Sequence, residues 1–92
     1  MTELVFTGLI VKQSRGYTAL CPELDVATEG ATPKAARRML QEAVTLYLET
    51  ALENNLPYLR PIQGEDNPLR TTPEQVVDNF PLRVSAKVLT RA

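Results

Sequence analysis

The sequence contains no histidine and only one cysteine. Zinc sites built from imidazole and thiolate ligands are therefore excluded, and so are catalytic triads in which histidine is the general base. A lone cysteine cannot form an internal disulfide, so the chain is not a disulfide-stapled scaffold. With two Phe, three Tyr and no Trp, the core must be largely aliphatic.

Long apolar runs and a dominant charge are also missing. No apolar stretch approaches the roughly 18 residues that a membrane span needs. The chain begins Met1-Thr2-Glu3, without the basic and apolar pattern of a signal peptide, so we expect a cytoplasmic protein and no membrane contact. Ten basic and eleven acidic residues give a net charge of −1, which does not favour nucleic-acid binding by the whole domain.

What is present suits one soluble domain, since the chain has 92 residues and 43% of them are hydrophobic. Thr32 to Asn54 predicts a long amphipathic helix, with Thr32 as the N-cap and Pro33 at the first helical position. Residues at steps of three and four share its apolar face. These are Ala36, Leu40, Ala43, Val44, Tyr47, Leu48 and Ala51.

Before the helix, three apolar stretches read as strands, at Leu4 to Val11, Tyr17 to Cys21 and Leu24 to Thr28. Gly16 can adopt a positive φ in the first turn. Pro22-Glu23 marks a second turn. These residues predict a three-stranded antiparallel meander that leads directly into the helix.

After the helix, a proline-rich stretch predicts an extended connector on the surface, anchored by Tyr58, Leu59 and Ile62. Thr72-Pro73-Glu74-Gln75 resembles a capping box and predicts a short helix to about Asn79. Leu82 to Leu89 alternates with a period of two, which indicates a half-exposed strand.

The predicted organisation is an α+β domain with the order β-β-β-α-β. A single domain spans residues 1–92, with a core at 3–54, the connector at 55–71, and the short helix and final strand at 72–90. We expect the last strand at the sheet edge beside the first and parallel to it, in the strand order 3-2-1-4, through a right-handed crossover.

Candidate catalytic groups are few. Glu23, Asp25 and Glu29 fall within seven residues, but two-metal hydrolysis needs several carboxylates that converge on ions, and Glu3 is the only carboxylate near the first strand. Cys21 has no histidine to activate it, so it reads as a packing residue. We therefore expect neither enzymatic activity nor a bound metal or cofactor.

The charges of the long helix oppose its dipole. Lys34, Arg37 and Arg38 occupy the N-terminal turns, whereas Glu49 and Glu53 occupy the C-terminal turns. Each placement costs about 0.3 to 1 kcal/mol when exposed. Either the basic end meets an anionic partner and the acidic end a basic one, or selection at exposed sites is weak. Leu52 also departs from the apolar period, which indicates an interface or a covering segment.

The run YTALCPELDVATEGATP at residues 17–33 resembles the HicB antitoxin family, as does its continuation through Ala36, Leu40, Glu42-Ala43-Val44 and Leu46-Tyr47-Leu48-Glu49. The resemblance implies a partial ribonuclease-H-like fold. It also implies a non-catalytic protein that binds and masks a small, basic, mRNA-cleaving toxin of the HicA type. Many family members carry a C-terminal DNA-binding module, which this chain has no room for, so direct DNA binding is not expected.

Two surfaces are candidate interfaces. Acidic and off-pattern side chains would face a basic partner, namely Glu23, Asp25, Glu29, Glu49, Leu52 and Glu53. The final strand would pair edge to edge in a homo-oligomer through Leu82, Val84, Ala86 and Val88. The alternatives are a solitary homo-oligomeric or ligand-binding module without a toxin, and a residual ribonuclease.

Overall fold

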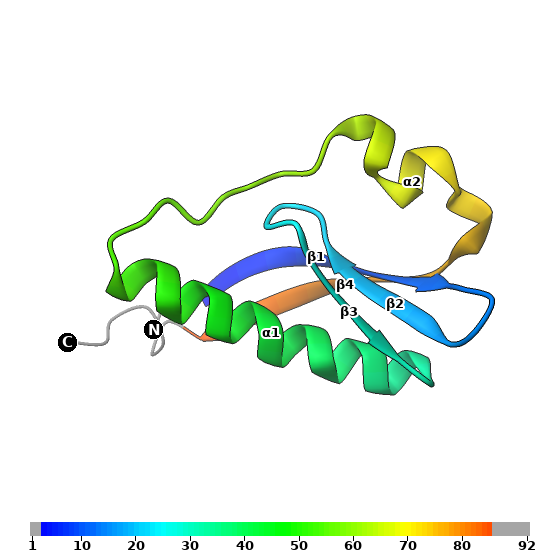
Figure 1. Ribbon diagram of the computed structural model, residues 1–92, viewed down its shortest axis with the longest axis horizontal. Helices are drawn as coiled ribbons and strands as arrows, with labels where there is room; N and C mark the ends of the chain where they lie inside the picture. Colours follow the sequence, from blue (N-terminus) through cyan, green and yellow to red (C-terminus); the bar gives the residue numbers. More distant parts are fainter. Residues whose placement is uncertain (1–2, 86–92) are drawn as a thin grey trace.

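The computed structural model describes residues 3–85, which form a four-stranded antiparallel sheet with one long helix (Figure 1). The elements follow in the order β1 (Glu3–Lys12), β2 (Tyr17–Cys21), β3 (Val26–Gly30), α1 (Pro33–Glu53), a 3-10 turn (Gly64–Asp66), α2 (Pro68–Thr71), a second 3-10 turn (Pro73–Gln75) and β4 (Val76–Ser85). The sheet order is β3-β2-β1-β4. The α+β class, the strand order and the edge position of the last strand are thus confirmed.

The direction of β4 differs from the prediction, because β4 runs antiparallel to β1. After α1, the connector travels back along the length of the sheet, so β4 starts beside the C-terminal end of β1 (Figure 1). The right-handed crossover rule governs parallel strands and therefore does not apply to this connection.

The start of β4 also differs from the prediction. No helix runs to Asn79; a 3-10 turn ends at Gln75 and the strand begins at Val76, which pairs with Val11. The Thr72 side chain makes no capping hydrogen bond. Long-range pairing with β1 has outweighed a local helix-start signal. Of the predicted strand Leu82 to Leu89, residues up to Ser85 are confirmed and 86–89 lie outside the described residues.

The local signals around α1 are confirmed. The Thr32 hydroxyl accepts a hydrogen bond from the Ala35 amide at 3.1 Å, and Pro33 is the first helical residue. Gly16 has φ +86° in the first turn. The third strand starts two residues later than predicted, because Leu24 and Asp25 complete the turn after β2, with Asp25 at φ +53°.

One face of the sheet packs on α1 to form the core. The helix contributes Ala36, Leu40, Val44 and Leu48, and the strands contribute Phe6, Ile10, Ala19, Cys21, Phe80, Leu82 and Val84. Close contact at Gly30 fixes the helix on the sheet. A Cβ atom on this glycine would lie 2.5 Å from the Ala36 backbone nitrogen.

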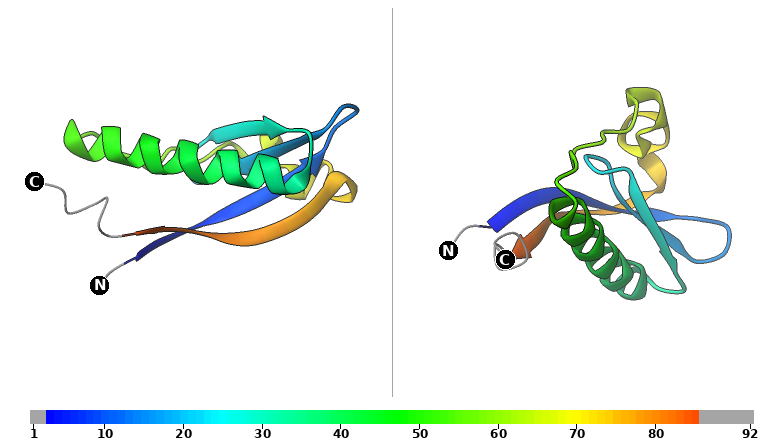
Figure 2. Two further views of the ribbon diagram at one scale, coloured as in Figure 1. Left: turned by 90° about the horizontal axis from the view of Figure 1, so that it is seen from below. Right: turned by 60° about the vertical axis from the view of Figure 1, so that its left-hand side comes forward.

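The connector covers part of the opposite face, so the sheet lies between two layers (Figure 2). Leu9 and Val11 point away from α1 but are 0% and 4% exposed. The Arg60 and Ile62 amides donate to the Glu23 and Pro22 carbonyl oxygens at 2.9 and 3.0 Å.

Two of the three predicted anchors of the connector are confirmed. Tyr58 packs edge-on against Phe6, and its carbonyl accepts a hydrogen bond from the Tyr47 hydroxyl at 2.8 Å. Ile62 is half-buried. Leu59 is 61% exposed, because successive residues of an extended segment point to opposite sides.

No helix within residues 3–85 has the length and apolar character that crossing a bilayer requires.

Candidate functional site

Glu23, in the turn after β2, is a structural residue rather than a free surface acid. Strand β2 turns away from β1 after Cys21, which leaves the Thr7 amide without a strand neighbour on that side. The Glu23 carboxylate accepts this N–H at 3.0 and 3.1 Å and the Thr7 hydroxyl at 2.7 Å. Partner binding by Glu23 stays a prediction, and within the chain its carboxylate closes an open stretch of β1.

Cys21 lies beside this carboxylate and is fully buried, which confirms that it is a packing residue. Its Sγ atom is 3.7 Å from Glu23 Oε1. Burial, and then the negative charge of Glu23, raise the pKa of the Cys21 thiol to about 12. The thiolate, which is the nucleophilic form, is therefore strongly disfavoured at neutral pH.

This raised pKa predicts a loss of stability in alkaline solution. Unfolding returns the Cys21 thiol to its ordinary pKa of 9.0, so the unfolded chain loses this proton first as the pH rises. The free energy of unfolding is unaffected by this titration below pH 9. Between pH 9 and about 12 it falls by up to about 1.4 kcal/mol per pH unit. Urea titrations should show the wild type losing stability relative to Cys21→Ala over this range. Parallel curves for the two proteins would contradict it.

The other two acids of this stretch of sequence, Asp25 and Glu29, lie on the sheet face that points away from α1. Glu29 pairs with Thr18, and Ala27 pairs with Leu20, on the side opposite Thr28, whose hydroxyl donates to the Ala36 carbonyl of the helix. A shallow depression of about 380 Å³ adjoins this surface. Its walls are Leu20, Asp25, Pro61, Ile62, Gln63 and Asp66.

We call this surface the acidic sheet face and define it by Leu20, Asp25, Ala27, Glu29 and Asp66. It combines three carboxylates with the apolar side chains of Leu20 and Ala27, and Asp25, Ala27, Glu29 and Asp66 are exposed. Asp25 and Glu29 were predicted to bind a partner, whereas Asp66 was missed. Asp66 is far from β3 in sequence, and only the folding of the connector over β2 brings it close.

The other predicted partner-binding residues lie elsewhere. Glu49, Leu52 and Glu53 belong to the C-terminal turns of α1, which packs on the opposite face of the sheet. Leu52 is half-buried. The structure therefore brings Asp25 and Glu29 to one face and does not join them to the helix residues.

A second depression, of about 480 Å³, lies along the N-terminal half of α1. Thr32, Lys34, Ala35, Arg37, Arg38 and Gln41 line it. The Arg37 guanidinium lies 4.0 Å from the centre of the Phe80 ring and 3.8 Å from the Asp78 carboxylate. Since both charged partners are about half exposed, this ion pair adds little stability.

The outer edge of β4 is poorly suited to strand addition. Pro81 lacks an N–H, and it pairs with Thr7, whose N–H points away from β4 toward Glu23. The backbone nitrogen of Pro81 therefore points to the outer side of β4, where it has no hydrogen to donate to an added strand. The Asn79 amide donates to the Asp78 side chain at 2.9 Å.

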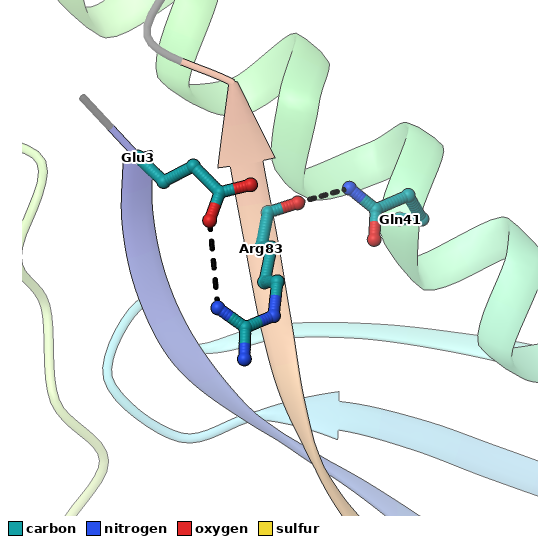
Figure 3. A network of polar contacts seen from close by, with 3 residues as sticks. All are labelled: Glu3, Gln41 and Arg83. Carbon is teal, nitrogen blue, oxygen red and sulfur yellow. Dashed lines mark hydrogen bonds and ion pairs between the residues drawn. The ribbon is translucent and has the colours of Figure 1, made fainter. Parts of the chain in front are cut away.

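Farther along β4, the Gln41 side chain of α1 donates to the Arg83 carbonyl at 2.8 Å, and the Arg83 guanidinium contacts Glu3 (Figure 3). Leu82 and Val84 are both 1% exposed and lie in the core. Ala86 and Val88 are outside the described residues. In the part of β4 that the structure describes, edge-to-edge association through Leu82 and Val84 is therefore disfavoured.

Within residues 3–85 no group of three or more Cys, Asp or Glu side chains is arranged to hold a metal ion. Comparisons with protein-family models, curated proteins and solved structures found no match to this chain.

Proposed function

We propose that this chain is a non-catalytic, cytoplasmic protein-binding domain of the HicB type, with a partial ribonuclease-H-like fold and no DNA-binding module. In this proposal it binds a small, basic, mRNA-cleaving toxin of the HicA type and masks the toxin's RNA-binding surface. Support comes from the motif at residues 17–33. Its cysteine and first glutamate have structural roles, and its next two acids, Asp25 and Glu29, are on the surface.

The observation that carries the proposal is the acidic sheet face. Asp25 and Asp66 line a depression with Leu20, and Ala27 and Glu29 follow on the same face of β3. This surface offers a basic partner both charge complementarity and an apolar contact. Opposite charges across an interface speed encounter and fix its register. A surface that binds RNA must itself be basic, so the same acids that capture the toxin would also occupy the place of the RNA phosphates.

A solitary homo-oligomer is the second candidate function. It is favoured by α1, whose outward side exposes Met39 by 46% and Leu46 by 65%. In this case the sheet face would have no dedicated protein partner.

Co-expression of the tagged chain with the product of an adjoining gene for a small basic protein tests the first candidate. We expect the two to co-purify, with a salt-dependent affinity. Neutralising the acidic sheet face by Asp25→Asn, Glu29→Gln and Asp66→Asn should weaken binding about tenfold or more, since surface charges act mainly through steering and complementarity. Asn is well tolerated at the positive φ of residue 25.

The control is a triple variant with the same change of charge elsewhere, at Glu42, Glu65 and Glu74, each replaced by Gln. All three are exposed and do not belong to the acidic sheet face. Equal weakening by both triple variants would show a general charge effect and would contradict docking at this face.

A further inference from the structure

The outward side of α1 carries a stripe of exposed residues that the core does not use. Arg38, Met39, Glu42, Leu46 and Glu53 are exposed and Glu49 is half-buried. These six residues follow at helical spacing, and we call them the outer stripe. Leu46 is 65% and Met39 46% exposed, whereas Leu40 and Leu48 of the same helix are fully buried. Two large apolar side chains seven residues apart on one side of a helix are typical of a helix-pairing surface.

Charge is divided between the two halves of α1. From Pro33 to Gln41 the helix carries basic residues and no acid, and from Glu42 to Glu53 it carries acids and no base. Arg37 contacts Asp78, but within residues 3–85 neither Lys34 nor Arg38 has an ion-pair partner. Both halves oppose the helix dipole, and within residues 3–85 the basic half has one ion pair, between Arg37 and Asp78.

We propose that α1 packs antiparallel against α1 of a second copy of this chain, about a two-fold axis level with Ala43. An antiparallel copy places the acidic half of one helix beside the basic half of the other, so the pattern is complementary to itself. A two-fold interface of this kind is closed and gives a dimer.

The spacing of the outer stripe fits such an axis. Met39 is four residues before Ala43 and Leu46 three residues after it, so each faces the other across the pair. Arg38 is five residues before and Glu49 six residues after. In each pair, the two residues are therefore equally far from Ala43 to within one residue, which is about 1.5 Å along the helix axis. Arg38 also lies one turn before Glu42 of its own helix, where it can contact two acids at once.

Within residues 3–85, Met39 and Leu46 remain exposed on this side of α1. Gln41 and Arg37 direct the other flank of the helix to β4, where they contact Arg83 and Asp78. Because the contact is a single helix pair, its area lies at the low end for protein interfaces, and we expect a dissociation constant in the range of micromolar. The dimer is independent of the acidic sheet face and needs no toxin.

Sedimentation of the purified chain alone tests the proposal. We expect dimers at concentrations of about 100 µM and low ionic strength, dissociating as salt is added. Arg38→Glu and Glu49→Lys should each weaken the dimer about tenfold or more. The double variant should restore it, because the exchanged charges meet again across the two-fold axis.

The double variant cannot restore the dimer through a contact within one chain, since residues 38 and 49 are about 16 Å apart along the helix. Leu46→Ser removes the exposed apolar contact and should also favour the monomer, while circular dichroism checks that each variant is folded. A wild-type monomer under these conditions, or a double variant no tighter than either single one, overturns the proposal. Either result leaves toxin binding at the acidic sheet face untouched, because the toxin is absent from this experiment.

Discussion

Replacing Gly30 with alanine is expected to lower the free energy of unfolding by about 3 kcal/mol, near the upper end for overpacking. Gly30 ends β3 where α1 begins to pack on it, and an added Cβ would lie 2.5 Å from the Ala36 nitrogen and 2.9 Å from its Cα. These are backbone atoms, so no side-chain rotation can make room. The helix would have to move away from β3, loosening the contacts of Leu40 and Val44 behind it.

Thermal unfolding measures this effect. For a domain of this size, 3 kcal/mol corresponds to a fall in Tm of roughly 12 to 24 °C. Gly64→Ala is the matched control. A Cβ there would meet only the guanidinium end of Arg70, which can rotate away, so its Tm should change little. If Gly30→Ala changed the Tm no more than Gly64→Ala, the close seating of α1 on β3 would be wrong.

Removing the Glu23 carboxylate has the second-largest expected effect. Glu23→Ala leaves the Thr7 amide and hydroxyl without the acceptor that they share, and both are only partly open to water. Hydrogen bonds to a charged group contribute about 1.5 to 3 kcal/mol each, and unsatisfied donors add to the loss. With water replacing part of the lost bonding, we expect a destabilisation of about 2 to 3 kcal/mol in urea titrations.

Two further variants show whether the loss comes from the acceptor itself. Glu23→Gln keeps one acceptor oxygen and should lose less than Glu23→Ala. Glu29→Ala, on the exposed side of β3, should lie within about 0.5 kcal/mol of the wild type. Similar stability for Glu23→Ala and Glu29→Ala would mean that Glu23 does not close the edge of β1.

Much of the fold could be predicted because its signals are local. The Thr32 cap, the Pro33 start and the apolar spacing of α1 lie within one stretch of chain, and so does the turn at Gly16. The direction of β4 could not be predicted in this way. It depends on the path of the connector over the sheet. The composition of residues 55–71 predicts that the connector is extended but not in which direction it runs.

The candidate site was harder to predict than the fold. Whether an acidic side chain is exposed depends on whether the folded chain leaves a hydrogen-bond donor without an acceptor nearby. Glu23 and Asp25 are only two positions apart in sequence but differ in this respect. Glu23 turns inward because β1 extends beyond β2 and leaves the Thr7 amide open, whereas Asp25, at positive φ, turns outward. Asp66 joins Asp25 only through the tertiary contacts of the connector. The adverse charges of α1, in contrast, were visible in the sequence and led to the proposed dimer.

The most direct test of the proposed masking function is a titration of RNA cleavage. The partner toxin would be incubated with a labelled mRNA fragment while the chain is added in increasing amounts, with Mg²⁺ present. The proposal predicts that cleavage stops near one equivalent of the chain per toxin, that the Asp25→Asn, Glu29→Gln, Asp66→Asn variant is needed in excess, and that the chain alone leaves the RNA intact. Cleavage that continues unchanged above stoichiometric amounts, or cleavage by the chain itself, would contradict it.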